Sequence, residues 1–401
     1  MKDVVIVAAK RTAIGSFLGS LASLSAPQLG QTAIRAVLDS ANVKPEQVDQ
    51  VIMGNVLTTG VGQNPARQAA IAAGIPVQVP ASTLNVVCGS GLRAVHLAAQ
   101  AIQCDEADIV VAGGQESMSQ SAHYMQLRNG QKMGNAQLVD SMVADGLTDA
   151  YNQYQMGITA ENIVEKLGLN REEQDQLALT SQQRAAAAQA AGKFKDEIAV
   201  VSIPQRKGEP VVFAEDEYIK ANTSLESLTK LRPAFKKDGS VTAGNASGIN
   251  DGASFTIVAS EDAVKKYNLK PIAEVIGFGQ GGVDPRVMGL GPTPAILNAL
   301  KYADLKIEDL DLVELNEAFA AQSLGVIHEL EEATGMDREA FLAKTNVNGG
   351  AIALGHPVGA SGNRILVSLL YEMQKRKSKI GLASLCIGGG QGAAVIVKMC
   401  D

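Results

Sequence analysis

A cysteine stands where the chain can present a thiol as a nucleophile. Cys88 follows the apolar pair Val86 and Val87 and precedes a glycine-rich turn at Gly89 and Gly91, after which an alanine-rich helical segment begins. The free N–H groups and the positive dipole end of a helix N-terminus favour a thiolate. The two glycines carry no side chain that would block a substrate. The pattern predicts a nucleophilic cysteine at a strand-to-helix corner, and the alternative is a buried cysteine that packs as a small hydrophobe.

A histidine stands at a second turn, far along the chain. His356 lies between Gly355 and Pro357, just before a helix that we expect to begin near Ser361. Proline fixes its own φ and therefore pins the turn. A histidine base beside a thiol raises the fraction of thiolate, so Cys88 and His356 together would form a working nucleophile. The alternative role for His356 is hydrogen bonding within the turn.

A second cysteine and an asparagine follow the ends of two other expected strands. Cys386 precedes a glycine run that begins at Gly388, and the uncovered N–H groups of such a run suit an oxyanion hole or a phosphate. Packing in the core is the alternative for Cys386. The amide of Asn316 could hold a water or a carbonyl oxygen, and it also suits the N-cap of a helix.

An internal repeat supplies the scaffold that would position these residues. Three pairs of segments resemble each other in the same order along the chain: 48–55 with 310–317, 90–93 with 361–364, and 107–115 with 382–391. Two halves of like topology, each a β/α unit with a central sheet, explain the repeat most economically. Packing of the halves about a pseudo-twofold axis would bring His356 opposite Cys88.

The repeat divides the chain into three parts. We expect residues 1–117 together with 250–270 to form the N-terminal half, and residues 271–401 to form the C-terminal half. Residues 118–249 differ in composition, because they are rich in Gln, Ala, Lys and Glu, and we expect them to form an inserted loop domain. Within this domain, residues 171–191 are predicted to form an exposed helix. Insertions on a rigid scaffold often carry binding surfaces.

Composition argues against several classes of function. The net charge of −7 and the lack of tryptophan argue against nucleic acid as a partner. The apolar run 4–9 is too short for a signal peptide or a membrane span and is typical of a buried strand, so we expect a cytoplasmic protein. The four cysteines form no CxxC pair and the histidines show no ligand spacing relative to them, so no metal site is expected.

Taken together, the motifs resemble the thiolase family, in particular its acetyl-CoA acetyltransferases. The four principal motifs are Val87–Gly91, Asn316–Phe319, Gly355–Pro357 and Cys386–Gly390. Further similarity covers residues 60–67, 113–119, 156–162 and 242–252, so the resemblance extends over nearly the whole chain. It implies an α/β fold in which two similar βαβαβαββ halves form a layered α/β/α/β/α arrangement with an inserted loop domain.

The resemblance also implies a role for each motif residue. Cys88 would accept the acyl group, His356 would activate Cys88, and Cys386 would move protons to the leaving thiol and from the α-carbon of the second substrate. Asn316 would hold a water that forms one oxyanion hole with His356. The backbone N–H groups of Cys88 and Gly388 would form the other oxyanion hole.

A further set of residues is implied in binding coenzyme A and the acyl group: Ser247, Met156, Gln155, Lys220, Met288, Ala318 and Phe319. Core packing is an equally good explanation of the two methionines. Gln155 stands beside Met156 where many relatives have histidine, and Lys220 stands where some have arginine, which leaves the details of coenzyme A binding open. Residues 328–344 form a longer connection than usual and are predicted to contain a surface helix.

The implied reaction condenses two acetyl-CoA molecules to acetoacetyl-CoA and CoA through an acyl-Cys88 intermediate, and also runs in reverse as thiolysis. No cofactor is implied, because the coenzyme A thioesters are substrates. A homotetramer, a dimer of dimers that pairs through a loop at 121–134, is implied as well. The alternatives are a longer-chain 3-ketoacyl-CoA thiolase, a ketoacyl synthase, a catalytically silent acyl-CoA-binding homologue and an NAD-binding protein. Cys386 argues against the synthase, which lacks such a base.

Overall fold

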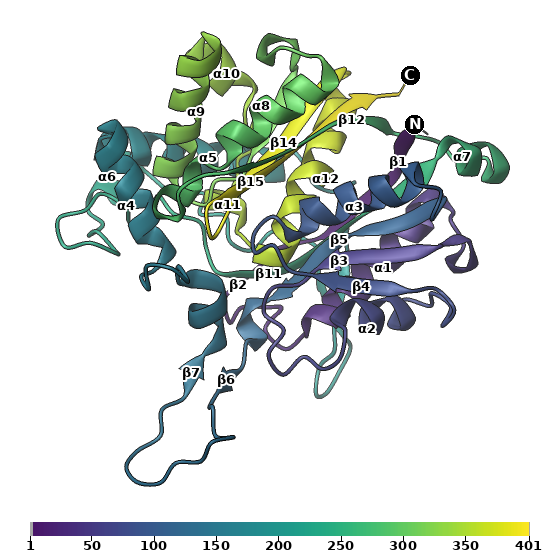
Figure 1. Cartoon of the computed structure of the whole chain (residues 1–401), viewed down its shortest axis with the longest axis horizontal. Helices are drawn as coiled ribbons and strands as arrows, with labels where there is room; N and C mark the ends of the chain where they lie inside the picture. Colours follow the sequence, from purple (N-terminus) through teal and green to yellow (C-terminus); the bar gives the residue numbers. More distant parts are fainter. Residues whose placement is uncertain (1–2, 401) are drawn as a thin grey trace.

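The computed structural model describes residues 3–400 and has a large mixed β-sheet at its centre (Figure 1). The strands follow the order β13-β14-β15-β12-β1-β11-β5-β3-β4, and the short strands β2 and β8 pair with β11 and β1. The bounds of these strands are β1 Val4–Thr12, β2 Gly15–Ser16, β3 Gln50–Gly54, β4 Ala81–Leu84, β5 Ile109–Ser117, β8 Ile198–Ala199, β11 Asn250–Ser260, β12 Ala273–Gly282, β13 Leu312–Leu315, β14 Ile380–Ile387 and β15 Gln391–Met399.

Helices cover both faces of the sheet. Their bounds are α1 Ala26–Ala41, α2 Pro65–Ala72, α3 Ser90–Gln103, α4 Met156–Leu167, α5 Arg171–Ala190, α6 Leu225–Thr229, α7 Glu261–Tyr267, α8 Pro292–Ala303, α9 Ala320–Thr334, α10 Arg338–Lys344, α11 Ala351–Leu354 and α12 Val358–Arg376. Over residues 3–400, none of these helices combines the length and the apolar character needed to cross a membrane.

The internal repeat is visible in the order of the principal elements. The N-terminal part runs β1-α1-β3-α2-β4-α3-β5-β11, and the C-terminal part runs β12-α8-β13-α9-α12-β14-β15. In both parts the last strand lies between the first strand and the strand before it, since β11 separates β1 from β5 and β15 separates β12 from β14. Where the first part has β4, the second has a parallel bridge between Val313 and Thr345. The predicted α/β fold of two like halves is confirmed.

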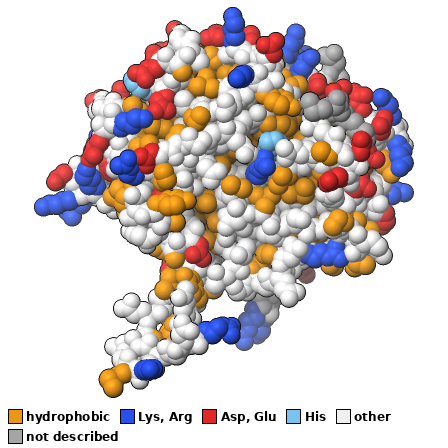
Figure 2. Space-filling model, in the orientation of Figure 1, with side chains coloured by type: hydrophobic (Ala, Val, Ile, Leu, Met, Phe, Trp, Pro, Cys, Tyr) orange, Lys and Arg blue, Asp and Glu red, His pale blue; other side chains and the backbone are white. Residues whose placement is uncertain are grey.

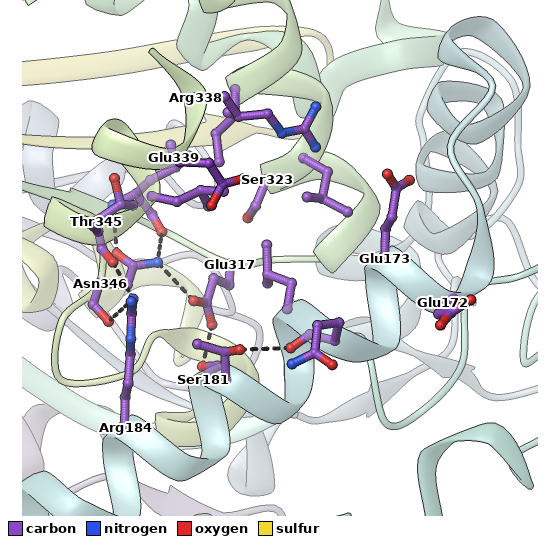
Figure 3. Close-up of a pocket in the computed structure, with 18 of the residues that line it drawn as sticks. Glu172, Glu173, Ser181, Arg184, Glu317, Ser323, Arg338, Glu339, Thr345 and Asn346 are labelled. Carbon is purple, nitrogen blue, oxygen red and sulfur yellow. Dashed lines mark hydrogen bonds between the residues drawn. The ribbon is translucent and has the colours of Figure 1, made fainter. Parts of the chain in front are cut away.

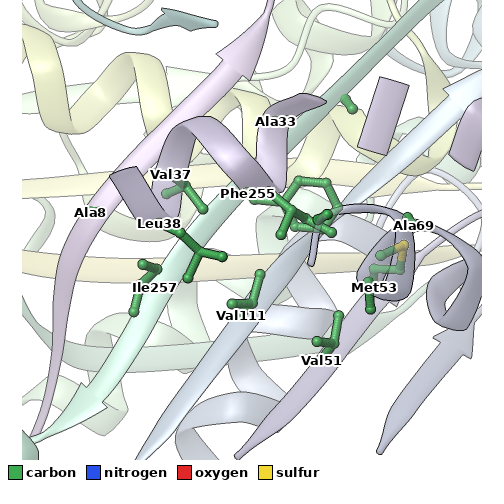
Figure 4. Close-up of a cluster of buried hydrophobic side chains, with 14 of the residues drawn as sticks. Ala8, Ala33, Val37, Leu38, Val51, Met53, Ala69, Val111, Phe255 and Ile257 are labelled. Carbon is green, nitrogen blue, oxygen red and sulfur yellow. The ribbon is translucent and has the colours of Figure 1, made fainter. Parts of the chain in front are cut away.

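Two helices form a layer between the halves. Helices α3 and α12 lie against each other, and their apolar side chains, such as Leu92 and Ile365, share one core with strands of both halves. Strand β5 is buried along its whole length, as expected for a strand with helices on both faces. On the outer face of the first half, Ala33, Val37 and Phe255 belong to a separate core beneath α1 and α2 (Figure 4). Helices α8 and α9 cover the second half in the same way.

Apart from the short strand β8, which pairs with β1, the segment between β5 and β11 lies outside the sheet. It contains α4, α5, α6, the hairpin β9 (Val201–Ile203) with β10 (Val211–Phe213), and the hairpin β6 (His123–Tyr124) with β7 (Val139–Asp140). The β6–β7 hairpin projects from the body of the molecule, and Figure 2 shows hydrophobic side chains along it. Leu127, Met133 and Leu138 are exposed there.

Two helices were predicted outside the sheet, and the structure agrees with one prediction in full and with the other in part. Helix α5 lies where an exposed helix was predicted, but one side of it is buried, including Ala178, Ser181 and Ala185. The prediction was therefore right in position and wrong in exposure, because small side chains let other elements pack closely on that side. The predicted surface helix within 328–344 is confirmed as α10.

Candidate active site

One cavity of about 570 Å³ is lined by both Cys88 and His356. It lies where the two halves and the inserted segment meet, since its walls also include residues of all three parts. The predicted coenzyme A and acyl-binding residues that line it are Gln155, Met156, Ser247, Met288, Ala318 and Phe319. The predicted residues therefore converge on one site, with the exception of Lys220, of Gly388, which does not line the cavity, and of the buried residues described below.

Cys88 lies at the apex of a turn between β4 and α3. The residue before it, Val87, has a φ of 46°, which a β-branched residue rarely adopts. Ser90 holds the turn, because its Oγ accepts from the N–H of Val86 at 2.9 Å and donates to the carbonyl of Val87 at 2.7 Å. This geometry is that of a nucleophile elbow with sulfur at its tip.

The glycines beside Cys88 allow close packing, whereas the sequence predicted that they keep the path of the substrate open. A Cβ on Gly89 would collide with the side chain of Ile387, and one on Gly91 would lie 2.8 Å from the backbone nitrogen of Asn363. These glycines face β14 and α12 rather than the cavity. Their lack of a side chain allows the two halves to approach each other, and access of substrate to Cys88 does not depend on it.

The charge state of Cys88 also differs from the prediction. Burial raises the pKa of its thiol to about 11, and the opposing backbone N–H groups of Gly388 and of Cys88 itself do not offset the loss of hydration. The nearby carboxylate of Glu116 adds a smaller increase. A helix N-terminus favours a thiolate, but here desolvation dominates. Cys88 is therefore a neutral thiol near pH 7, and it needs a base to become a nucleophile.

His356 has the properties of that base. Its Nδ1 lies 2.6 Å from the Oγ of Ser361, and this hydroxyl donates to the carbonyl of Pro357 at 2.8 Å. The serine oxygen therefore accepts the proton of Nδ1–H, which leaves a lone pair on Nε2. Nε2 has no hydrogen-bond partner within residues 3–400. Burial, helped by the charge of Arg364, lowers the pKa of His356 to about 3, so the ring is neutral.

Cys386 lies at the end of β14 and is fully buried. Burial raises the pKa of its thiol far above the usual range, and the neighbouring sulfur of Cys88 raises it further. It packs in one apolar cluster with Met288, Ala318 and Phe319, three residues that line the cavity. A second thiol therefore lies beside Cys88, just beneath the cavity wall.

Asn316 is also fully buried and lies outside the set of residues that line the cavity. Its Oδ1 accepts from Nη2 of Arg364 at 3.4 Å, and its Nδ2 donor has no partner within the described residues. The alternative that Asn316 caps a helix is wrong, because α9 begins after Phe319, which occupies the N-cap position. The hydrogen bond from Arg364 thus orients the amide of Asn316 through its oxygen.

The predicted coenzyme A contacts divide into two groups. Ser247 donates its backbone N–H to the carbonyl of Ala318 at 2.9 Å, which ties the inserted segment to the cavity wall. Gln155 precedes the first residue of α4, and its side chain makes no capping hydrogen bond. Lys220 does not line the cavity: its N–H donates to the side chain of Gln182, and its ammonium lies 5.0 Å from the ring centre of Tyr218. Tyr218 lines the cavity in its place.

Two positioning residues were not found by sequence reasoning. Ser361 was noted only as the start of a helix, and its bond to His356 depends on a turn geometry that no spacing reveals. Glu116 is fully buried and accepts hydrogen bonds from Val56, Leu57 and Gly359 at 2.9 to 3.1 Å. It therefore joins a loop of the first half to the start of α12. Glu116 lies in a motif that carried the resemblance, which was the one available signal.

The residues of the described chain include no group of three or more His, Cys, Asp or Glu side chains arranged to hold a metal ion. The chemistry that the site offers is instead that of two thiols, one neutral imidazole and several directed N–H groups. This set suits the formation and breakdown of a covalent thioester, because it combines a thiol nucleophile with a neutral base.

Comparison with known proteins agrees with this geometry. Residues 4–262 match the model of the thiolase N-terminal domain, and residues 269–399 match that of the thiolase C-terminal domain. The acetyl-CoA acetyltransferases of Chromobacterium violaceum and Cupriavidus necator are 63% and 57% identical, over 99% of this chain and at least 99% of theirs.

Solved structures agree as well. The acetyl-CoA acetyltransferase of Bacillus anthracis superposes with a TM-score of 0.95 at 42% identity, covering 100% of this chain and 99% of that one. A human mitochondrial 3-ketoacyl-CoA thiolase in complex with CoA gives 0.93 at 47% identity, covering 100% and 98%. On these grounds, and on the paired motifs at its two turns, the chain belongs to the thiolase family.

Proposed function

We propose that this protein is an acetyl-CoA C-acetyltransferase that condenses two acetyl-CoA molecules to acetoacetyl-CoA and CoA and catalyses the reverse thiolysis. The observation that carries the proposal is the position of a neutral thiol, Cys88, in one cavity with a neutral histidine whose Nε2 has no hydrogen-bond partner among residues 3–400. Full-length relatives named acetyl-CoA acetyltransferase, at 57–63% identity, support the same activity.

The first half-reaction transfers the acetyl group to Cys88. Nε2 of His356 takes the thiol proton as the sulfur attacks the thioester carbon, and the N–H groups of Cys88 and Gly388 stabilise the oxyanion. When the tetrahedral intermediate collapses, Cys386 gives its proton to the leaving sulfur of coenzyme A. The products are acetyl-Cys88, CoA, a protonated His356 and a Cys386 thiolate.

The second half-reaction uses the thiolate left on Cys386. It removes a proton from the methyl group of a second acetyl-CoA, and the resulting carbanion attacks the acetyl carbon on Cys88. Asn316, through a water, and His356 stabilise the enolate oxygen. Cys88 leaves as a thiolate and recovers its proton from His356. Both cysteines and the histidine thereby return to their starting states, so no cofactor is required.

Substrate binding and assembly complete the proposal. The coenzyme A arm would lie along Ser247 and Gln155, and the acyl group against Met156, Met288, Ala318 and Phe319. The proposed division into residues 1–117 with 250–270, 118–249, and 271–401 is supported by the pairing of β11 with β1 and β5. The exposed apolar side chains of the β6–β7 hairpin support association with further copies of the chain. The proposal makes this assembly a homotetramer and places it in the cytoplasm.

The proposal is tested by locating the acetyl group. The protein is incubated with acetyl-CoA, quenched in acid and digested, and the acetyl mass is mapped on the peptides. We expect it on Cys88, and label confined to Cys386, Cys104 or Cys400 would overturn the assignment. Steady-state thiolysis rates with acetoacetyl-CoA and with longer 3-ketoacyl-CoAs then separate this function from the longer-chain alternative.

A further inference from the structure

A second cavity, of about 690 Å³, lies between α5, α9 and α10 and is separate from the one that holds Cys88 (Figure 3). No residue lines both cavities. The walls of the second are apolar where the helices face one another, through Leu177, Leu324, Ile327 and Leu342. None of the chemistry proposed above takes place in it.

The floor of this cavity is a buried carboxylate. Glu317 accepts from Oγ of Ser181 at 2.6 Å, from Nδ2 of Asn346 at 2.8 Å and from the N–H of Ile352 at 3.3 Å. All three groups are donors, so the arrangement suits the ionised form of the carboxylate. Among residues 3–400 no cation forms an ion pair with Glu317; burial dominates and raises its pKa, although the three donors and the charge of Arg364 lower it. A positive charge in the cavity would compensate this buried charge.

A second group in the same cavity lacks a partner. Ser323 lines the cavity and is 2% exposed, and within the described residues its Oγ makes no hydrogen bond. Figure 3 shows Ser323 on the α9 side, above Glu317. A buried hydroxyl without a partner costs free energy, so a donor or acceptor supplied from the cavity would be favourable there.

The charges around the cavity indicate the sign of the ligand. Four glutamates and two arginines line it, which leaves an excess of negative charge. Glu173 and Glu339 are exposed at its edge. The guanidinium of Arg184 donates to the backbone carbonyls of Thr345 and Asn346, so its hydrogen bonds are made to the backbone. Carboxylates on the floor and at the edge, with leucine and isoleucine between them, match a cation on an aliphatic chain.

We propose that this cavity binds a small aliphatic primary amine in its ammonium form, with the nitrogen at Glu317 and Ser323 and the methylene groups against the apolar walls. A linear diamine is expected to bind more tightly than a monoamine, because its second ammonium reaches the glutamates at the edge. The ammonium donates three hydrogen bonds, which suits a floor made of a carboxylate and a hydroxyl.

The cavity also lies behind the active-site segment. Glu317 is the neighbour in sequence of Asn316 and Ala318, and it joins that segment to α5 through Ser181. An amine on Glu317 is therefore expected to change the rate of acetylation of Cys88. This second part rests on the proposed function, whereas the binding itself does not.

Binding is measured by titration calorimetry with n-butylammonium chloride and with 1,4-diaminobutane dihydrochloride, against potassium chloride at equal ionic strength. The Cys88→Ala variant is used, so that no covalent chemistry contributes heat. We expect dissociation constants on the order of 1 mM for the monoamine, as for other ligands of this size. Sodium butyrate, which has the opposite charge, should give no binding. Heats no larger than those of potassium chloride would overturn the proposal.

Two substitutions on α10 locate the site. Ala343 lines the cavity, and Ala343→Phe places a ring at its mouth, whereas Ala340 is exposed on the same helix outside the lining set. We expect Ala343→Phe to weaken diamine binding at least about tenfold and Ala340→Phe to leave it unchanged. Equal affinities in the two variants would refute the location. Glu317→Gln should also lose binding, and its folding is checked by circular dichroism.

The coupling is tested separately on the unsubstituted protein. The single-turnover rate of Cys88 acetylation is measured with and without saturating diaminobutane, and we expect a change of at least about twofold. An unchanged rate with proven binding would reject the coupling alone. A protein that binds the amine but never acetylates Cys88 would instead reject the proposed function.

Discussion

Replacement of Ser361 by alanine tests whether His356 is a base because of its partner or merely because of its position. The substitution removes the one acceptor of Nδ1–H, at 2.6 Å, and leaves that buried N–H unpaired. An unpaired buried donor costs about 1–3 kcal/mol. The tautomer with its proton on Nε2 avoids this cost, but its Nε2 has no lone pair to accept the proton of Cys88.

If the loss of Ser361 destabilises the tautomer that acts as a base by that free energy, acetylation of Cys88 should slow by about 5- to 150-fold. The assay is single-turnover acetylation at saturating acetyl-CoA, measured by quenched flow and mass spectrometry. Ser368→Ala is the matched control, because Ser368 lies on the same helix and donates to Glu197 at 3.1 Å, away from His356. A Ser361→Ala rate within about twofold of the unsubstituted protein would refute the tautomer argument.

Three further predictions follow from the same geometry. Burial holds the pKa of His356 at about 3, below its usual 6.5, so the unfolded chain binds more protons between these values and stability falls as the pH drops through this window. From pH 7 to pH 5, the free energy of unfolding measured in urea should therefore fall by about 2 kcal/mol less in His356→Gln than in the unsubstituted protein. Equal decreases in the two proteins would contradict this. Cys386→Ala should still take up an acetyl group but lose the exchange of acetyl-CoA methyl protons with deuterated water; exchange at the original rate would exclude its role as base. Gly91→Ala should lower the free energy of unfolding by about 1–3 kcal/mol, because its Cβ would lie 2.8 Å from the backbone of Asn363. Gly282→Ala, whose Cβ would meet nothing closer than 3.9 Å, should not.

The sequence was most informative where chemistry and local backbone coincide. Cys88 and His356 each stand at a turn bounded by glycine or proline, and a few adjacent residues determine turns of this kind. The repeat predicted that these two turns would face each other, and they share one cavity. Both predictions used only local patterns and a symmetry between them.

What the sequence did not reveal depends on contacts between distant segments. The helix N-terminus was expected to favour a thiolate at Cys88, whereas burial, which no motif records, raises the pKa of this thiol. Ser361 and Glu116 act through hydrogen bonds whose partners are known only once the chain is folded. Lys220 was named because it stands where some relatives have arginine, but its ammonium lies over the ring of Tyr218, and Tyr218 lines the cavity.

The place of β11 in the sheet has a consequence for synthesis of the chain. Strand β11 pairs with β1 on one side and β5 on the other, although more than 130 residues separate it from β5 in sequence. A nascent chain that ends before residue 250 holds β1 and β5 without the strand that joins them, and its apolar strand edges stay unpaired. The first half therefore closes only after the inserted segment has left the ribosome. Translation of that segment is the interval in which the nascent chain most needs protection from aggregation.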